Sequence, residues 1–113
     1  MSGAGERDAM AVSARLTELT RKFVTRTAGD VAQMRDALVQ IEAGDLSALA
    51  QIHQLTHRAC GTGGTLGLCA LSDAASDLER LIEALPKDAA PGAAGRAQIA
   101  AGLDAIAGQL ARL

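Results

Sequence analysis

Residues His57–Gly67 read His-Arg-Ala-Cys-Gly-Thr-Gly-Gly-Thr-Leu-Gly, and this stretch is the most informative part of the chain. Glycines follow the histidine at offsets of four, seven and ten residues, at Gly61, Gly64 and Gly67. The segment before it is strongly helical, so the first of these residues share one helix face. That face carries an imidazole with almost no side-chain bulk around it. The pattern favours a nucleophile that another protein can approach.

A helical wheel over this segment separates a core face from a solvent face. At about 100° per residue, the core face spans an arc of roughly 60° and comprises Ala48, Ile52, Leu55, Ala59 and Leu66. His57 lies roughly 170° from the centre of that arc and is predicted to point at solvent. Its neighbours on the wheel are His53, Ala50, Cys60, Gly61 and Gly64.

The glycines beside His57 have no evident role in stability, since each costs about 0.5–1 kcal/mol relative to alanine inside a helix. Because they lack a Cβ, Gly61 and Gly64 would let a partner's backbone approach the ring. The alternative is that they merely end the helix. An exposed imidazole is mostly unprotonated near neutral pH, so it can attack an activated phosphoryl group whose metal and geometry come from elsewhere.

Apolar residues at helical spacing predict an all-α protein. The expected helices cover residues 8–27, 31–41, 46 onward, 68–85 and 99–113. Asp30 and Asp45 are N-cap candidates, and Gly44 suits a left-handed C′ position. The last four helices are expected to form an up-down antiparallel four-helix bundle, and the additional N-terminal helix to cover one end or side of it.

Length and composition narrow the class of protein. The 113 residues suffice for one small domain, with residues 1–7 expected to be flexible and residues 86–95 to be a linker before the last helix. A net charge of −2 and an aromatic content of 1% argue against nucleic acid as a partner. No targeting segment or apolar run of ~18–20 residues is evident, so we expect a cytoplasmic protein without membrane contact and with reduced cysteines. The apolar stripes are largely used internally, which favours a monomer.

Taken with its flanks, this stretch resembles the histidine phosphotransfer (HPt) domain family, the carriers of two-component phosphorelays. The family pattern has a glycine four residues after the histidine, small residues next, a glycine at offset ten, and then a helix with leucines and a glutamate. The resemblance runs from about Leu16 to Leu85. It rests on His57, Gly61, Thr62-Gly63-Gly64, Leu66, Gly67, Leu71, Leu78 and Glu79, and upstream on Phe23, Ala37-Leu38, Gly44-Asp45 and Leu49.

The chain departs from the family pattern at two positions. Ala59 stands at offset two, where leucine is usual, and Cys60 stands at offset three in place of the lysine that helps to hold the phosphate. Arg58 is a candidate substitute for that charge, although it lies ~100° round the helix.

The resemblance implies a phosphotransfer carrier with His57 as the phosphoacceptor. Its Nε2 would take a phosphoryl group from a receiver domain of a hybrid histidine kinase and pass it to the aspartate of a response regulator. The receiver would supply Mg²⁺, and the chain itself is expected to have no cofactor, no metal and no ATP-dependent kinase activity. Docking is expected to use the exposed residues His53, Gln54, Arg58, Cys60, Gly61 and Gly64.

Other interpretations of these residues stay open. His53 and His57, at i and i+4 with Cys60 nearby, have a spacing that can bind a transition metal, but no further ligand and no acidic neighbour is evident. His53 is a rival phosphoacceptor, with His57 standing where a glycine would leave room. The glycine run lacks the Lys-Ser/Thr of a nucleotide loop, and Cys60 lacks the partners of a catalytic thiol. A non-catalytic scaffold or interaction module is the alternative function.

Overall fold

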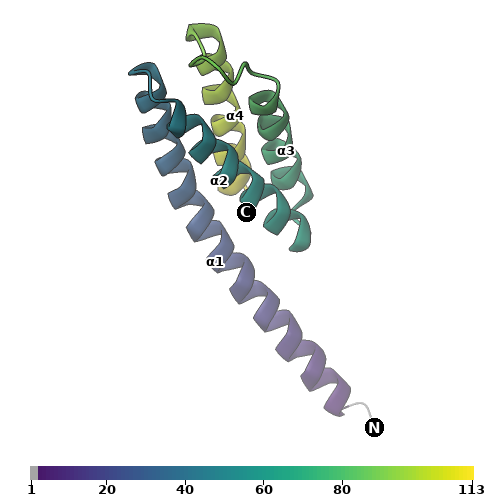
Figure 1. The fold of residues 1–113 in the computed structure, drawn as a ribbon. Coiled ribbons are helices and arrows are strands. Elements are labelled where there is room, and N and C mark those ends of the chain that lie inside the picture. Colours follow the sequence, from purple (N-terminus) through teal and green to yellow (C-terminus); the bar gives the residue numbers. More distant parts are fainter. Residues whose placement is uncertain (1–2) are drawn as a thin grey trace.

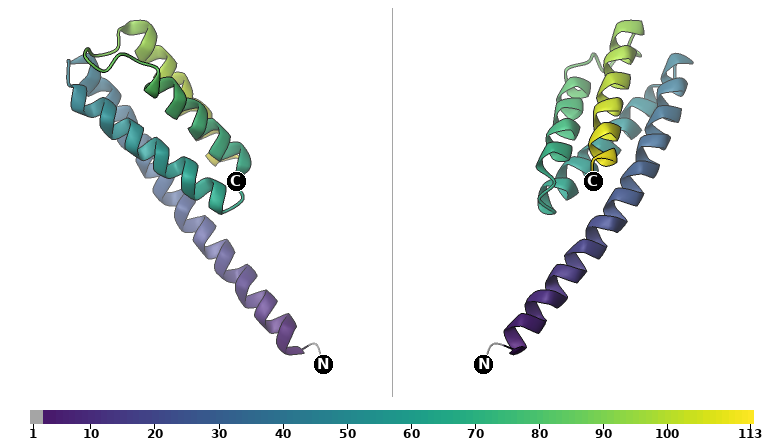
Figure 2. Two further views of the ribbon diagram at one scale, coloured as in Figure 1. Left: turned by 45° about the vertical axis from the view of Figure 1, so that its right-hand side comes forward. Right: turned by 180° about the vertical axis from the view of Figure 1, so that it is seen from behind.

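The computed structural model describes residues 3–113, which form four α-helices (Figure 1). They are α1 (Gly3–Glu42), α2 (Leu46–Thr65), α3 (Cys69–Glu83) and α4 (Ala93–Ala111), and no strand occurs within this range. Helices α2 and α4 each pack against both α1 and α3. Successive helices run in alternating directions (Figure 2), so the predicted antiparallel four-helix bundle is confirmed.

The core lies where the apolar stripes of the four helices meet. Its most completely buried large side chains are Met34, Ile41, Ile52, Leu71, Leu78, Ile99, Leu103 and Ile106. Helices α3 and α4 come close together at Gly102, where an added Cβ would lie 2.7 Å from Cδ1 of Leu78. That glycine is required by packing, because any side chain there would displace a buried leucine.

The N-terminal helix does not exist as a separate element, and this part of the prediction is wrong. Gly29-Asp30 lies inside α1, a single helix of 40 residues. Asp30 is not an N-cap; its buried carboxylate accepts a hydrogen bond from Nη2 of Arg58 at 2.7 Å. Phe23 and Val31 are buried on either side of Gly29. Packing along this face outweighs the cost of about 1 kcal/mol for a glycine inside a helix.

The N-terminal half of α1 projects past the bundle instead of covering it (Figures 1 and 2). The molecule is therefore elongated, measuring 64 Å along its longest axis and 22 Å and 21 Å across it. Val12, Leu16 and Leu19 continue the apolar stripe of α1 but are 67%, 48% and 49% exposed. The stripe is present as predicted, yet the premise that such stripes are covered internally does not hold for it.

The turn into α2 follows the sequence closely. Gly44 has a left-handed φ of +96°, and the carboxylate of Asp45 accepts a hydrogen bond from the backbone N–H of Ser47 at 2.9 Å. Both match the predicted stop and cap signals.

Two expected boundaries need adjustment. The loop between α3 and α4 covers residues 84–92, so residues 93–95 of the expected linker are helical. Of the expected flexible segment, residues 1–2 lie outside the described residues, and residues 3–7 belong to α1. No helix in the described part of the chain combines the length and apolar character needed to cross a membrane.

Candidate functional site

His57 lies in α2 with 74% of its side chain exposed. Its exposure follows from the core face of α2, where Ala48, Ile52 and Ala59 are buried against the other helices. The helical wheel therefore placed this ring correctly. It did not identify Thr56, which is fully buried and donates a hydrogen bond to Sδ of Met34 at 3.4 Å.

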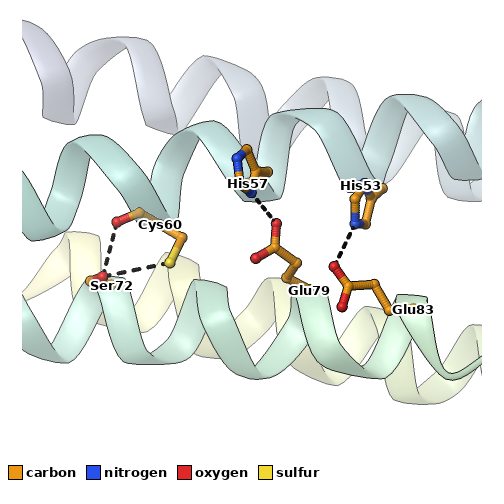
Figure 3. A network of polar contacts seen from close by, with 6 residues as sticks. All are labelled: His53, His57, Cys60, Ser72, Glu79 and Glu83. Atoms are coloured by element: carbon orange, nitrogen blue, oxygen red, sulfur yellow. Dashed lines mark hydrogen bonds and ion pairs between the residues drawn. The ribbon is translucent and has the colours of Figure 1, made fainter.

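A glutamate of α3 holds the ring of His57. Oε2 of Glu79 lies 2.5 Å from Nδ1 of His57, and the Glu79 side chain is only 15% exposed (Figure 3). A carboxylate only accepts hydrogen bonds, so Nδ1 carries the proton in this pair. The other ring nitrogen, Nε2, then keeps its lone pair. The geometry orients the imidazole with its nucleophilic nitrogen free.

A second pair of the same type lies one helical turn away on the same two helices. Nε2 of His53 lies 3.1 Å from Oε1 of Glu83, and the two side chains are 38% and 53% exposed. Figure 3 shows both pairs bridging α2 and α3 side by side. In this pair the bonded nitrogen is Nε2. The free nitrogen of His53 is therefore Nδ1, which lies nearer to its own backbone.

The surface of α2 beside His57 carries almost no side-chain bulk, because two exposed glycines lie there. A Cβ at Gly61 would meet no other heavy atom within 4 Å, and one at Gly64 would meet only Oγ of Ser72, at 3.4 Å. Gly61 is therefore not required by the protein's own packing. The helix continues to Thr65, so the alternative that these glycines merely end it fails for Gly61.

At position 60, where the resemblance leads one to expect a lysine, the thiol of Cys60 points toward α3. Sγ of Cys60 lies 3.7 Å from Oγ of Ser72, and this hydroxyl donates to the Cys60 carbonyl oxygen at 2.9 Å. The candidate substitute for the missing charge, Arg58, is engaged with Asp30 of α1. Among the predicted docking residues, Gln54 is exposed and otherwise uncommitted by any described contact.

Three donor groups could hold a cation at this site. His53, Glu79 and Glu83 each offer a ligand atom, and these atoms lie within 4.8 Å of one another. Sequence reasoning did not find the two glutamates as partners of the histidines, nor Ser72 as the partner of Cys60. A signal was present for the glutamates: they repeat at i and i+4 on the helix that follows, the same spacing as the two histidines.

A family model described as Hpt domain matches residues 18–111. No curated protein and no solved structure matches the chain significantly. The matched segment contains α2, α3, α4 and the part of α1 that packs in the bundle, and it leaves out most of the projecting part of α1.

Proposed function

This chain belongs to the Hpt domain family, and we propose that it relays a phosphoryl group between the aspartates of receiver domains through His57. Hpt domains are phosphotransfer modules of two-component signalling, and they interact with receiver domains. The observation that carries the proposal is the exposed ring of His57, whose Nδ1 is engaged by Glu79 while Nε2 is free. The chain acts as a carrier and not as an ATP-dependent kinase.

The proposed transfer uses Nε2 of His57 as the nucleophile. Its lone pair attacks the phosphorus of an aspartyl phosphate; the N–P bond forms as the bond from phosphorus to the carboxylate oxygen breaks, and the aspartate leaves with that electron pair. The ring keeps its proton on Nδ1, where the negative charge of Glu79 stabilises the positive charge that develops on the imidazole. The same steps in reverse deliver the group to a second receiver.

The receiver supplies the rest of the chemistry. Its Mg²⁺ neutralises the phosphoryl oxygens during transfer, and its surface docks over the exposed part of α2 around His57. Gly61 and Gly64 leave room for that approach, and Gln54 offers an uncommitted polar group. His53, Arg58 and Cys60 border this surface. The contact is expected to be small and transient, as in many signalling encounters.

The test is phosphoryl acceptance from a phosphorylated receiver, with His57→Gln compared with His53→Gln. Glutamine keeps a polar side chain of similar length but cannot accept the group at a ring nitrogen. We expect His57→Gln to fall to background and His53→Gln still to yield an alkali-stable, acid-labile phosphoprotein. Labelling of His57→Gln would contradict the proposal. Absence of labelling of the wild type by every receiver tested would favour the scaffold alternative.

A further inference from the structure

Between α2 and α3, four side chains form two neighbouring histidine–glutamate pairs (Figure 3). Glu79 belongs to the pair with His57, but its carboxylate also lies beside the other pair. The ligand atoms of His53, Glu79 and Glu83 all fall within 4.8 Å of one another. Glu79 is thus shared between the exposed ring of His57 and a compact group of three donors.

The chemistry of these donors suits a transition-metal ion. Zn²⁺ binds imidazole nitrogen and carboxylate oxygen at about 2.0–2.2 Å in tetrahedral geometry, which places ligand atoms roughly 3.3–3.6 Å apart. Nε2 of His53 and Oε1 of Glu83 already lie 3.1 Å apart. The separations that involve Glu79 reach at most 4.8 Å and would have to shorten to this spacing on binding. His53 and Glu83 are 38% and 53% exposed, which leaves an open path from solvent.

The charges around the site also favour a cation. Within residues 3–113, the ion pairs of Glu79 and Glu83 involve only histidines and neither lysine nor arginine. Of the cationic side chains nearby, Arg80 is paired with Asp77, and Lys87 lines one pocket with His53 and Glu83 without an ion pair to either glutamate in the described part of the chain. A divalent cation would supply the missing positive charge between two carboxylates. The imidazole ligand selects Zn²⁺ and similar ions over Mg²⁺ and Ca²⁺, which prefer oxygen ligands alone.

We propose that His53, Glu79 and Glu83 bind a divalent transition-metal cation such as Zn²⁺, and that the bound ion draws Glu79 away from His57. A water molecule completes the coordination. The ring of His57 then loses the carboxylate that fixes its protonated nitrogen, and phosphoryl acceptance slows. This regulatory part rests on the proposed function of His57, whereas the metal site itself does not.

Calorimetric titration of the full chain with Zn²⁺ tests the site. We expect one saturable equivalent, no comparable signal with Mg²⁺, and at least a tenfold weaker affinity in both His53→Gln and Glu83→Gln. Asp77→Asn is the matched control, because it removes the same charge from an exposed position of α3. Equal weakening in Glu83→Gln and Asp77→Asn would overturn the site, as would binding that Cys60→Ser abolishes and Glu83→Gln retains. Helical content measured by circular dichroism verifies that each variant is folded.

The regulatory part is tested by the ratio of phosphoryl-acceptance rates with and without saturating Zn²⁺, taken within each variant. We expect at least a fivefold inhibition in the wild type and a ratio near one in Glu83→Gln. Equal inhibition in both would place the effect of Zn²⁺ on the receiver and overturn the coupling. If the protein binds the metal but the metal-free protein accepts no phosphoryl group, the phosphotransfer function alone is contradicted. If the protein accepts a phosphoryl group but binds no metal, the metal site alone is contradicted.

Discussion

His53 and His57 stand one turn apart on α2, and each meets a glutamate of α3, but the two pairs use opposite ring nitrogens. Glu79 engages Nδ1 of His57, whereas Glu83 engages Nε2 of His53. The free nitrogen of His57 is therefore the outer one, at the far side of the ring from the helix backbone. The contact from the neighbouring helix thus leaves a different ring nitrogen free in each histidine.

Their surroundings differ as well. Four residues after His57 stands Gly61, where a Cβ would meet open space, whereas four residues after His53 stands His57 itself. The side chains of His57 and His53 are 74% and 38% exposed. Two features of His57 could therefore explain why it and not His53 would be the phosphoacceptor: its free Nε2 and the open space beside it. Variants can separate these two explanations.

The largest effect is expected from His57→Gly, which gives His53 a glycine at offset four. If open space decided the choice, His53 would now become the acceptor. We expect acceptance to fall at least a hundredfold instead, because Nε2 of His53 stays engaged with Glu83. Quantifying phosphohistidine after exposure to a phosphorylated receiver measures this. A labelled His53 in this variant would show that crowding, and not the hydrogen bond, excludes it.

Only part of this difference between His53 and His57 could be predicted from the sequence. The wheel placed His57 outside the core because helical periodicity depends on local spacing alone, and the Gly44-Asp45 turn was identified for the same reason. Which glutamate meets which histidine depends on the register of α3 against α2, and packing of the whole bundle sets that register.

Packing also explains the main error in the fold. Gly29-Asp30 has the local appearance of a helix boundary. The carboxylate of Asp30, however, accepts a hydrogen bond from Arg58, which is far away in the sequence. The buried residues on both sides keep α1 continuous. Where a tertiary contact overrides a local signal, sequence periodicity alone cannot reveal it.

The next largest effect separates the two glutamates. Glu79→Gln keeps a hydrogen-bond acceptor beside Nδ1 of His57 but removes the negative charge that stabilises the developing imidazolium. Because a charge-assisted hydrogen bond contributes about 1.5–3 kcal/mol, we expect acceptance to slow by roughly 10–100-fold. Glu83→Gln removes the same charge one turn away. The factor by which it slows acceptance should be at least five times smaller than the factor for Glu79→Gln. Rapid-quench rates of both variants with one receiver decide the matter, and equal rates would assign the effect to general electrostatics.

A smaller effect is expected when the open space is filled. Gly61→Leu should slow transfer from a receiver about tenfold, because the side chain obstructs docking, and still react with phosphoramidate, a small phosphoryl donor. The same change should raise the melting temperature, since leucine favours the helix by about 0.5–1 kcal/mol over glycine. Gly108→Leu on α4 is the matched control, as a Cβ there also meets nothing within 4 Å. If the two variants slowed transfer alike, Gly61 would have no part in docking.

The smallest effect concerns the start of α2, which lies nearer to His53 than to His57. The hydroxyl of Ser47, followed by its backbone N–H, donates to Asp45 and lowers the pKa of that carboxyl below its ordinary value. A lowered pKa means that the cap stabilises the fold above the ordinary carboxyl value, and that this contribution is lost as the pH falls through the folded value. Acid should therefore loosen the first turn of α2 before it affects the turn that carries His57.

Amide-exchange protection of Ser47 and Ala48, followed by NMR from about pH 5 downward, measures this step. Asp45→Asn keeps an N-cap side chain that does not titrate, so its protection should show no such step. An identical acid step in that variant would trace the loosening to a group other than Asp45.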